Sequence, residues 1–377
     1  MKITFPHMGN AWIVIQTLFE SLNVEVVVPP PNNKKALDLG IRLAPESACL
    51  PLKLNLGNYI EAAERGADTL VITGGVGPCR FGYYGELAKE ILDQAGYPYD
   101  VVVLEPPNGS LLGLAKRIKY LAGEKNSWLK IVQAIHFAYH KSVVLDQIED
   151  FVHQARPYLG TTVENIFTKA QYKLAEKMSY AGVADVLTWV EEATNIEEFK
   201  QRAKNENQLP LKVGIVGEIY TILDSFTSLD VEKYLGALGV EVDRSIYLSG
   251  WVGEHVFQGV AQGHRPMGHY PKLAEPYLKH FVGGHGVETV GGAVEFARSK
   301  YDGIIQIFPL TCMPEIVAAS ILPRIQEDYK VPIMTLVVDE HTGKAGMETR
   351  LEAFVDLLQR SRSGGILREG EFGFGAK

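Results

Sequence analysis

Cysteine is scarce in this chain, which has only Cys49, Cys79 and Cys312 among 377 residues. An odd and low count excludes a small secreted domain held together by disulfides, because such domains are dense in paired cysteines. Thiols stay free in reducing compartments, so we expect a cytoplasmic protein.

Long apolar runs are also missing. No stretch reaches the ~18 consecutive apolar residues that a membrane span needs, so we expect no association with a membrane. The opening residues MKITFPHMGN contain one lysine, and Pro6 and Gly9 interrupt the apolar run. This start is not typical of a signal peptide.

A basic excess and complete nucleotide motifs are absent as well. The 37 basic and 45 acidic side chains give a net charge of −8, which argues against nucleic-acid binding. HTGKAG (341–346) lacks the spacing and the hydroxyl residue of a phosphate-binding loop, so we do not expect an ATPase. KVGIVGE (212–218) is an incomplete dinucleotide fingerprint, which disfavours an NAD-linked oxidoreductase.

What the sequence does contain is an alternation of short apolar runs with amphipathic stretches. Apolar runs without polar alternation are typical of parallel strands that are covered on both faces. We predict strands within 2–6, 24–29, 68–74, 99–106, 211–220, 240–248, 301–309 and 331–339. We predict helices over 11–22, 54–65, 84–94, 111–121, 131–156, 163–181, 184–204, 230–238, 291–299, 314–329 and 349–361.

This order predicts an α/β fold with two Rossmann-like or flavodoxin-like parallel-sheet lobes and a helical middle segment. NENQLP (205–210) is polar and ends in proline, as linkers often do. We expect an N-terminal lobe over 1–125, a helical connection over 126–208, a second lobe over 209–362 and a flexible tail over 363–377.

All three cysteines occupy turns that open a predicted helix. Cys79 and Cys312 follow predicted strands of different lobes, and Cys49 precedes the helix that leads to the Cys79 strand. Ligands of open parallel sheets lie beyond the carboxyl ends of the strands, so the three thiols can converge on a cleft between the lobes. Helix N-termini favour the thiolate, and we expect Arg80 and Lys53 to add to this effect.

Three interpretations of these thiols stay open at this point. They are buried packing residues, they form a zinc site with a fourth ligand, or they hold an iron–sulfur cluster with one open position.

Several segments resemble the 2-hydroxyacyl-CoA dehydratase and benzoyl-CoA reductase superfamily, closest to its CoA-enzyme activase-related branch. They are PHMGN (6–10), PESACLPLKLNLGNY (45–59), GGVGPCRFGYYGE (74–86), KVGIVGE (212–218) and FPLTCMPE (308–315). The resemblance implies a [4Fe–4S] cluster bound by Cys49, Cys79 and Cys312. It also implies a partner, an actin-like ATPase activase that carries its own iron–sulfur cluster.

The function expected from this resemblance is low-potential electron transfer, or reductive chemistry related to 2-hydroxyacyl-CoA dehydration. An acyl-CoA or another small molecule is the expected ligand, and a homo- or hetero-dimer the expected assembly. No catalytic residue is identified, although Glu46 and Glu315 lie close to the cysteines in sequence. The alternative is a non-redox ligand-binding or scaffold protein with two lobes, whose cysteines bind zinc or are purely structural.

The histidines match no standard zinc pattern. His255, His264 and His269 are interpreted as part of a polar surface loop, and His280 and His285 as the flanks of a mobile turn near the cleft. His136, His140 and His153 are expected on solvated faces of the middle helices.

Overall fold

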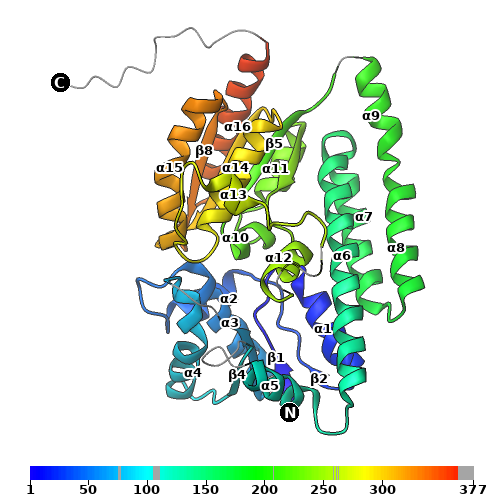
Figure 1. The fold of residues 1–377 in the computed structure, drawn as a ribbon, viewed down its shortest axis with the longest axis vertical. Helices are drawn as coiled ribbons and strands as arrows, with labels where there is room; N and C mark the ends of the chain where they lie inside the picture. The colour runs from blue at the N-terminus through cyan, green and yellow to red at the C-terminus, as the bar shows by residue number, and fades with distance from the viewer. Residues whose placement is uncertain are drawn as a thin grey trace, which may run out of the picture.

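Two parallel sheets organise the chain, as Figure 1 shows, with the first lobe below the second. The structure is a computed structural model that describes residues 1–74, 78–104, 111–206, 208–257, 259, 261 and 263–363. The predicted α/β fold with two parallel-sheet lobes is confirmed. The predicted domain limits stay a prediction, and residues 364–377 of the predicted flexible tail lie outside the described residues.

The first sheet has the strand order β2-β1-β3-β4, with every pair parallel. Its strands are β1 (Lys2–Thr4), β2 (Glu25–Val26), β3 (Thr69–Thr73) and β4 (Asp100–Leu104). Its helices are α1 (Ala11–Ser21), α2 (Lys34–Ile41), α3 (Leu50–Glu64), the 3₁₀ turn η1 (Arg80–Tyr83), α4 (Tyr84–Gln94) and α5 (Leu111–Ala122).

The second sheet repeats this layout in the order β6-β5-β7-β8. Its strands are β5 (Leu211–Gly217), β6 (Val240–Arg244), β7 (Gly303–Pro309) and β8 (Ile333–Val338). Its helices are α10 (Ile219–Leu223), α11 (Val231–Ala237), α12 (Leu248–His255), α13 (Tyr270–Ala274), α14 (Gly286–Arg298), α15 (Met313–Tyr329) and α16 (Lys344–Arg362). All seven residues of β7 are buried, as expected for a strand covered on both faces.

The middle of the chain is helical, with α6 (Trp128–Leu159), α7 (Thr161–Glu176), α8 (Tyr180–Thr194) and α9 (Ile196–Asn205). In Figure 1, α6 runs beside both lobes and α8 and α9 lie outside it. The predicted helix over 163–181 is interrupted because Ser179 caps α8 by accepting a hydrogen bond from the Gly182 amide at 3.2 Å. The predicted helix over 184–204 is divided at Asn195, whose φ of 42° is left-handed.

A buried hydrogen-bonded seam joins the two lobes. The Asn32 amide donates to the His7 carbonyl at 2.9 Å, to Tyr220 Oη at 3.0 Å and to Asp224 Oδ2 at 3.0 Å. Tyr220 Oη donates to the same His7 carbonyl at 2.8 Å. Gly9 contributes close backbone contact, since an added Cβ there would lie 1.9 Å from the Leu223 carbonyl oxygen. The seam therefore fixes the start of the chain against α10.

Within the described part of the chain, no helix is both long enough and apolar enough to cross a lipid bilayer.

Helices α2 and α3 touch backbone to backbone through two glycines. A Cβ added at Gly57 would lie 1.8 Å from the Ala36 carbonyl oxygen, and one at Gly40 would lie 1.6 Å from the Lys53 carbonyl oxygen. Helix α3 is buried at every position from Leu50 to Ala62, so it has no free side toward which it could shift. These glycines are consequently required by packing.

We predict that Gly57→Ala lowers the free energy of unfolding by about 2 kcal/mol or more, because overpacking outweighs the helix propensity gained. Gly346→Ala in α16 is the control, since nothing lies within 4 Å of its added Cβ. Thermal unfolding followed by circular dichroism measures both variants. An unchanged midpoint for Gly57→Ala would show that the two helices can separate without cost.

Candidate functional site

Each cysteine is the N-cap residue of a helix. Cys49 precedes α3, Cys79 precedes η1 and Cys312 precedes α15. Pro51 in α3 and Pro314 in α15 occupy the first two helical positions, where proline's missing N–H costs no hydrogen bond. The prediction that all three thiols lie in turns that open helices is confirmed.

The Arg80 side chain ties the three cysteine turns together. Its guanidinium donates to the Ser47 carbonyl at 2.9 Å, two residues before Cys49. It also donates to the Thr311 carbonyl at 2.8 Å and to Thr311 Oγ1 at 2.9 Å, one residue before Cys312. Because Arg80 itself follows Cys79, turns from both lobes converge on one side chain. Thr311 Oγ1 adds a hydrogen bond to the Ser47 carbonyl at 3.2 Å.

Glu218 lies on the same side of the seam as these turns. It follows β5 and caps α10 by accepting hydrogen bonds from the amides of Tyr220 at 3.0 Å and Thr221 at 2.9 Å. After burial, its negative charge is a further cause that raises the pKa of all three thiols. The three sulfurs thus share the field of one carboxyl group.

Burial, and not the helix N-termini, dominates the acidity of the thiols. It raises the pKa of Cys49 to about 11 and raises the pKa of Cys79 and Cys312 as well. Arg80 lowers the first two of these pKa values by a smaller amount. The expectation of stabilised thiolates is therefore wrong for the metal-free protein.

The ammonium group of Lys53 is held by two glutamates. Its ammonium donates to the Glu46 carbonyl at 3.2 Å and pairs with the Glu340 carboxylate. A lysine held by a carboxylate is unavailable to Cys49, which corrects the expected role of this residue. The Cys49 sulfur lies 2.6 Å from Tyr84 Oη instead.

The loop before α14 closes over Cys79. Gly283 has a φ of 85°, and a Cβ added there would lie 2.8 Å from the Cys79 amide nitrogen. A Cβ added at Gly284 would lie 3.7 Å from the Cys79 sulfur and 3.1 Å from Pro314 Cγ. Both glycines therefore permit the close approach of this loop. His285 follows them and accepts a hydrogen bond from Trp251 Nε1 at 2.9 Å, and burial lowers its pKa to about 3.

Glu315 is fully buried behind the Cys312 turn. Its carboxyl group accepts hydrogen bonds from Thr289 Oγ1 and from Gln306 Nε2, each at 3.0 Å. Burial raises its pKa to about 8, so it is largely a neutral acid at pH 7. Glu46 contributes only its backbone carbonyl to the bonds described above.

No group of three or more His, Cys, Asp or Glu side chains in the described ranges is arranged to hold a metal ion. The three turns are therefore tied together by Arg80, but the described side chains are not arranged as a metal site.

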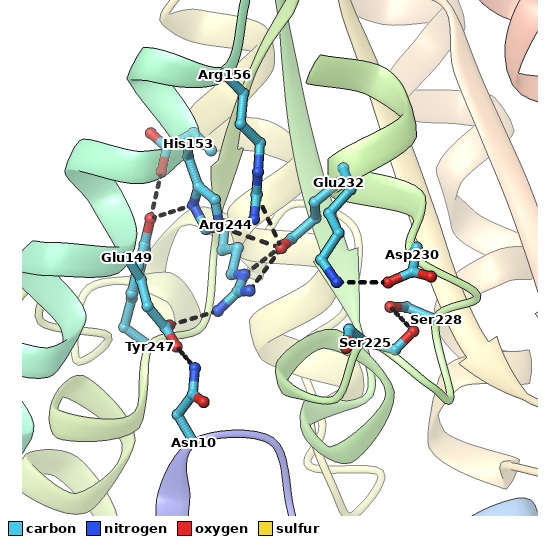
Figure 2. Close-up of polar contacts among 12 residues, drawn as sticks. Asn10, Glu149, His153, Arg156, Ser225, Ser228, Asp230, Glu232, Arg244 and Tyr247 are labelled. Atoms are coloured by element: carbon cyan, nitrogen blue, oxygen red, sulfur yellow. Dashed lines mark hydrogen bonds and ion pairs between the residues drawn. The ribbon is translucent and has the colours of Figure 1, made fainter. Parts of the chain in front are cut away.

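A second polar cluster, which the sequence reading missed, joins α6 to the second lobe (Figure 2). Arg244 donates to Glu232 Oε2 at 2.6 Å and to Glu149 Oε2 at 2.7 Å. His153 Nε2 lies 3.1 Å from Glu232 Oε2, and Arg156 Nε donates to Glu164 at 2.7 Å. We call these residues with Asn10, which donates to Glu149 at 2.6 Å, the ion network.

The expectation of a solvated His153 is wrong, because its side chain is buried and paired with Glu232. His136 is exposed on its helix, as expected, and lies 2.7 Å from Tyr180 Oη. The spacing of Glu149, His153 and Arg156 places them on one helix face, which is the signal that would have indicated the ion network.

Comparison with known proteins gives one family. Residues 7–72 match the model of the CoA enzyme activase uncharacterised domain (DUF2229). The matched segment contains Cys49 and the first-lobe half of the seam, and it supports a relationship to CoA-enzyme activase-related proteins. No curated protein matches the chain.

We predict that Cys49 in the metal-free folded protein is alkylated with a half-maximal rate at about pH 11, whereas an unperturbed thiol titrates near pH 9.0. Burial delays ionisation, and only the thiolate reacts. Iodoacetamide labelling followed by peptide mass spectrometry measures the pH profile, with urea-unfolded protein as the control. Identical profiles for folded and unfolded chains would contradict the raised pKa of Cys49.

We predict that Glu232→Gln lowers the free energy of unfolding at pH 7 by about 3 kcal/mol, because Arg244 and Arg156 lose their shared carboxylate. Burial alone would raise the pKa of Glu232, but Arg244 and His153 hold it well below its usual value of 4.5. The carboxylate therefore stabilises the fold above pH 4.5, and this contribution disappears as the pH falls through the lowered pKa.

Denaturant unfolding at several pH values tests this assignment. The difference in free energy of unfolding between the variant and the wild-type chain should become smaller below pH 4.5. Glu192→Gln on the exposed face of α8 is the matched control, expected to change stability little at any pH. If the difference in free energy of unfolding did not change with pH, the ion network would not be its cause.

Proposed function

We propose that this chain binds a [4Fe–4S] cluster at Cys49, Cys79 and Cys312 and acts in low-potential electron transfer or in reductive chemistry related to 2-hydroxyacyl-CoA dehydration. The observation that carries the proposal is the Arg80 junction, which ties the turn before Cys49 and the turn before Cys312 to the residue that follows Cys79. The family match over the segment that contains Cys49 supports a relationship to CoA-enzyme activase-related proteins, from which the proposal proceeds.

The chemistry of the donor set fits a soft metal centre. Thiolates are the ligands of iron–sulfur clusters, and three of them leave one iron free for another group. When bound, the cluster would supply one-electron transfer at low potential. Because the free thiols are protonated at neutral pH, loading would release protons and weaken as the pH falls.

The surrounding residues supply order and electrostatic tuning. Arg80 holds the turns through backbone carbonyls, so the thiols remain available as ligands. Gly283 and Gly284 carry the covering loop close to Cys79 without side chains of their own. Glu315 lies buried behind the Cys312 turn, where Thr289 and Gln306 hold its carboxyl group by hydrogen bonds.

The proposal includes a partner and a ligand class. An actin-like ATPase activase with its own cluster would deliver the electrons, since the chain carries no phosphate-binding loop motif of its own. An acyl-CoA or a related small molecule would take the open position. The assembly we propose is a homo- or hetero-dimer, as the resemblance to the dehydratase and reductase superfamily implies.

We predict that anaerobically purified or reconstituted protein is brown, absorbs near 400 nm and contains about four iron and four sulfide ions per chain. Cys49→Ala, Cys79→Ala and Cys312→Ala should each lose most of this iron. Ser320→Ala in α15 is the control, since its exposed hydroxyl bonds only to the Val317 carbonyl of the same helix.

Two results would overturn the cluster. The first is colourless protein with iron near zero after reconstitution, which would favour cysteines that serve only packing. The second is one zinc ion per chain that depends on the same cysteines. Either result would favour the non-redox ligand-binding protein over the redox protein. Circular dichroism of each variant separates loss of metal from loss of fold.

A further inference from the structure

Outside the cysteine turns, a second candidate site is a cavity of about 420 Å³ where the two lobes meet the middle helices. Its walls carry aromatic rings and charged side chains that pair with one another. Arg244 donates to Glu232 Oε2 at 2.6 Å, and Lys233 lies 2.9 Å from Asp230. Cations without such partners gather elsewhere, at one end of the molecule.

This end is formed by α5, the turn over 123–127 and the first turns of α6. In Figure 1 it lies at the bottom of the long axis, opposite α9 and α16. The segment 111–132 carries one acidic side chain, Glu124, and five basic ones: Lys116, Arg117, Lys119, Lys125 and Lys130. The whole chain has a net charge of −8, so a positive segment stands out in an acidic protein.

The same segment exposes several large apolar side chains. More than half of the surface of each is exposed, in Leu112, Tyr120, Trp128, Leu129 and Val132. Single exposed apolar side chains are ordinary, but a group of them on one surface marks a contact with another molecule or a membrane.

Helical spacing places these side chains together with the cations. The exposed side chains among those described in α5 are Leu112, Lys116 and Tyr120, which follow one another at intervals of four and so share a face. Trp128 and Val132 of α6 are also four residues apart. Each helix therefore turns an apolar surface to the solvent, and α5 places a lysine within it.

The turn that joins the two helices is held by hydrogen bonds. Asn126 Nδ2 donates to the Leu22 carbonyl at 2.7 Å and to the Ala122 carbonyl at 2.5 Å. The Lys119 ammonium donates to the Glu124 carbonyl at 3.1 Å. The surface is consequently formed before any partner arrives, which keeps the entropy cost of binding low.

The cations of this segment keep their charge available. In the part of the chain that the structure describes, no carboxylate lies within ion-pair distance of Lys116, Lys125 or Lys130. Two carboxylates are near, since Glu124 lies in the turn and Asp100 accepts a hydrogen bond from Tyr120 Oη at 2.6 Å. The five basic side chains still outnumber them.

An anionic bilayer surface matches this combination of charge and apolar area. Lysine and arginine are attracted to acidic headgroups, and exposed Trp, Tyr and Leu side chains enter the boundary between headgroups and acyl chains. The rest of the chain carries the acidic excess and is repelled by such a surface, which restricts the contact to this end.

We propose that α5, the turn over 123–127 and the first turns of α6 form a peripheral membrane-binding surface for anionic lipid headgroups. Trp128 and Leu129 insert at the headgroup boundary, and Lys116 and Lys125 lie against the headgroups. Attachment of this kind needs no spanning helix, so it revises the expectation of no association with a membrane. It goes beyond the proposed cluster chemistry and depends on none of the cysteines.

Co-sedimentation of the full-length protein with lipid vesicles tests the attachment. Vesicles of phosphatidylcholine with phosphatidylserine should bind the protein at least about tenfold more tightly than vesicles of phosphatidylcholine alone, because several cations approach the anionic surface. Raising the NaCl concentration to about 0.5 M should weaken the binding, since salt screens this attraction.

Two double variants separate charge from insertion. Lys116→Glu with Lys125→Glu reverses two exposed cations, and Trp128→Ser with Leu129→Ser removes two exposed apolar side chains. Each pair should weaken binding to the phosphatidylserine vesicles at least about tenfold. Circular dichroism confirms that the variants are folded.

Matched control pairs lie on other surfaces of the chain. Lys272→Glu with Lys279→Glu reverses two exposed cations of the second lobe, and Leu209→Ser with Leu357→Ser removes two exposed leucines. Binding of both control pairs should stay within about twofold of the wild-type chain.

Three results would overturn the proposal: no binding to phosphatidylserine vesicles, equal binding to vesicles of phosphatidylcholine alone, or binding that neither pair in the segment weakens. A second copy of the chain would replace the membrane if the wild-type protein ignored vesicles and Trp128→Ser with Leu129→Ser dissociated a dimer in sedimentation velocity. An acidic protein would replace it if the wild-type chain bound polyglutamate but no vesicles. All of these measurements are independent of iron.

Discussion

The buried seam between the lobes is the contact on which the remaining features depend. The amide group of Asn32, in the first lobe, donates its hydrogen bonds within the seam. Its acceptors include Tyr220 and Asp224 of the second lobe. Such bonds are costly to break one at a time, because each loss leaves a buried polar group unpaired. The seam therefore fixes the two sheets relative to each other. It thereby sets the geometry of each site whose residues come from both lobes.

Helix α10 carries the seam and separates the two candidate sites. Glu218 caps its start, on the side where the cysteine turns converge, and Asp224 ends it on the side of the cavity. The cysteine turns are tied by Arg80 through backbone carbonyls, whereas the cavity is walled by paired charges and aromatic rings. The two sites therefore differ in chemistry, since thiols lie at one of them and ion pairs and aromatic rings line the other.

The sequence predicted the strands and most helices because their signals are local. Runs such as DTLVITG and GIIQIFP are mostly apolar and show no regular polar alternation, as is typical of strands buried on both faces of a parallel sheet. Breaks inside helical stretches were missed, since a serine cap at 179 and a left-handed Asn195 look like ordinary surface residues. The N-cap positions of all three cysteines followed from the same local reading. Their acidity did not, because burial outweighs the helix terminus and depends on contacts from distant segments.

By itself, the sequence determined the class of fold, the order of its elements and the position of each thiol at the start of a helix. These properties depend on periodicity and capping within a few residues. Only the tertiary structure decided that Arg80 joins the three turns, that His153 is buried against Glu232, and that residues of both lobes and of the middle helices line one cavity. The reason is physical: burial and ion pairing join residues far apart in the chain, and no local pattern encodes which of them will meet.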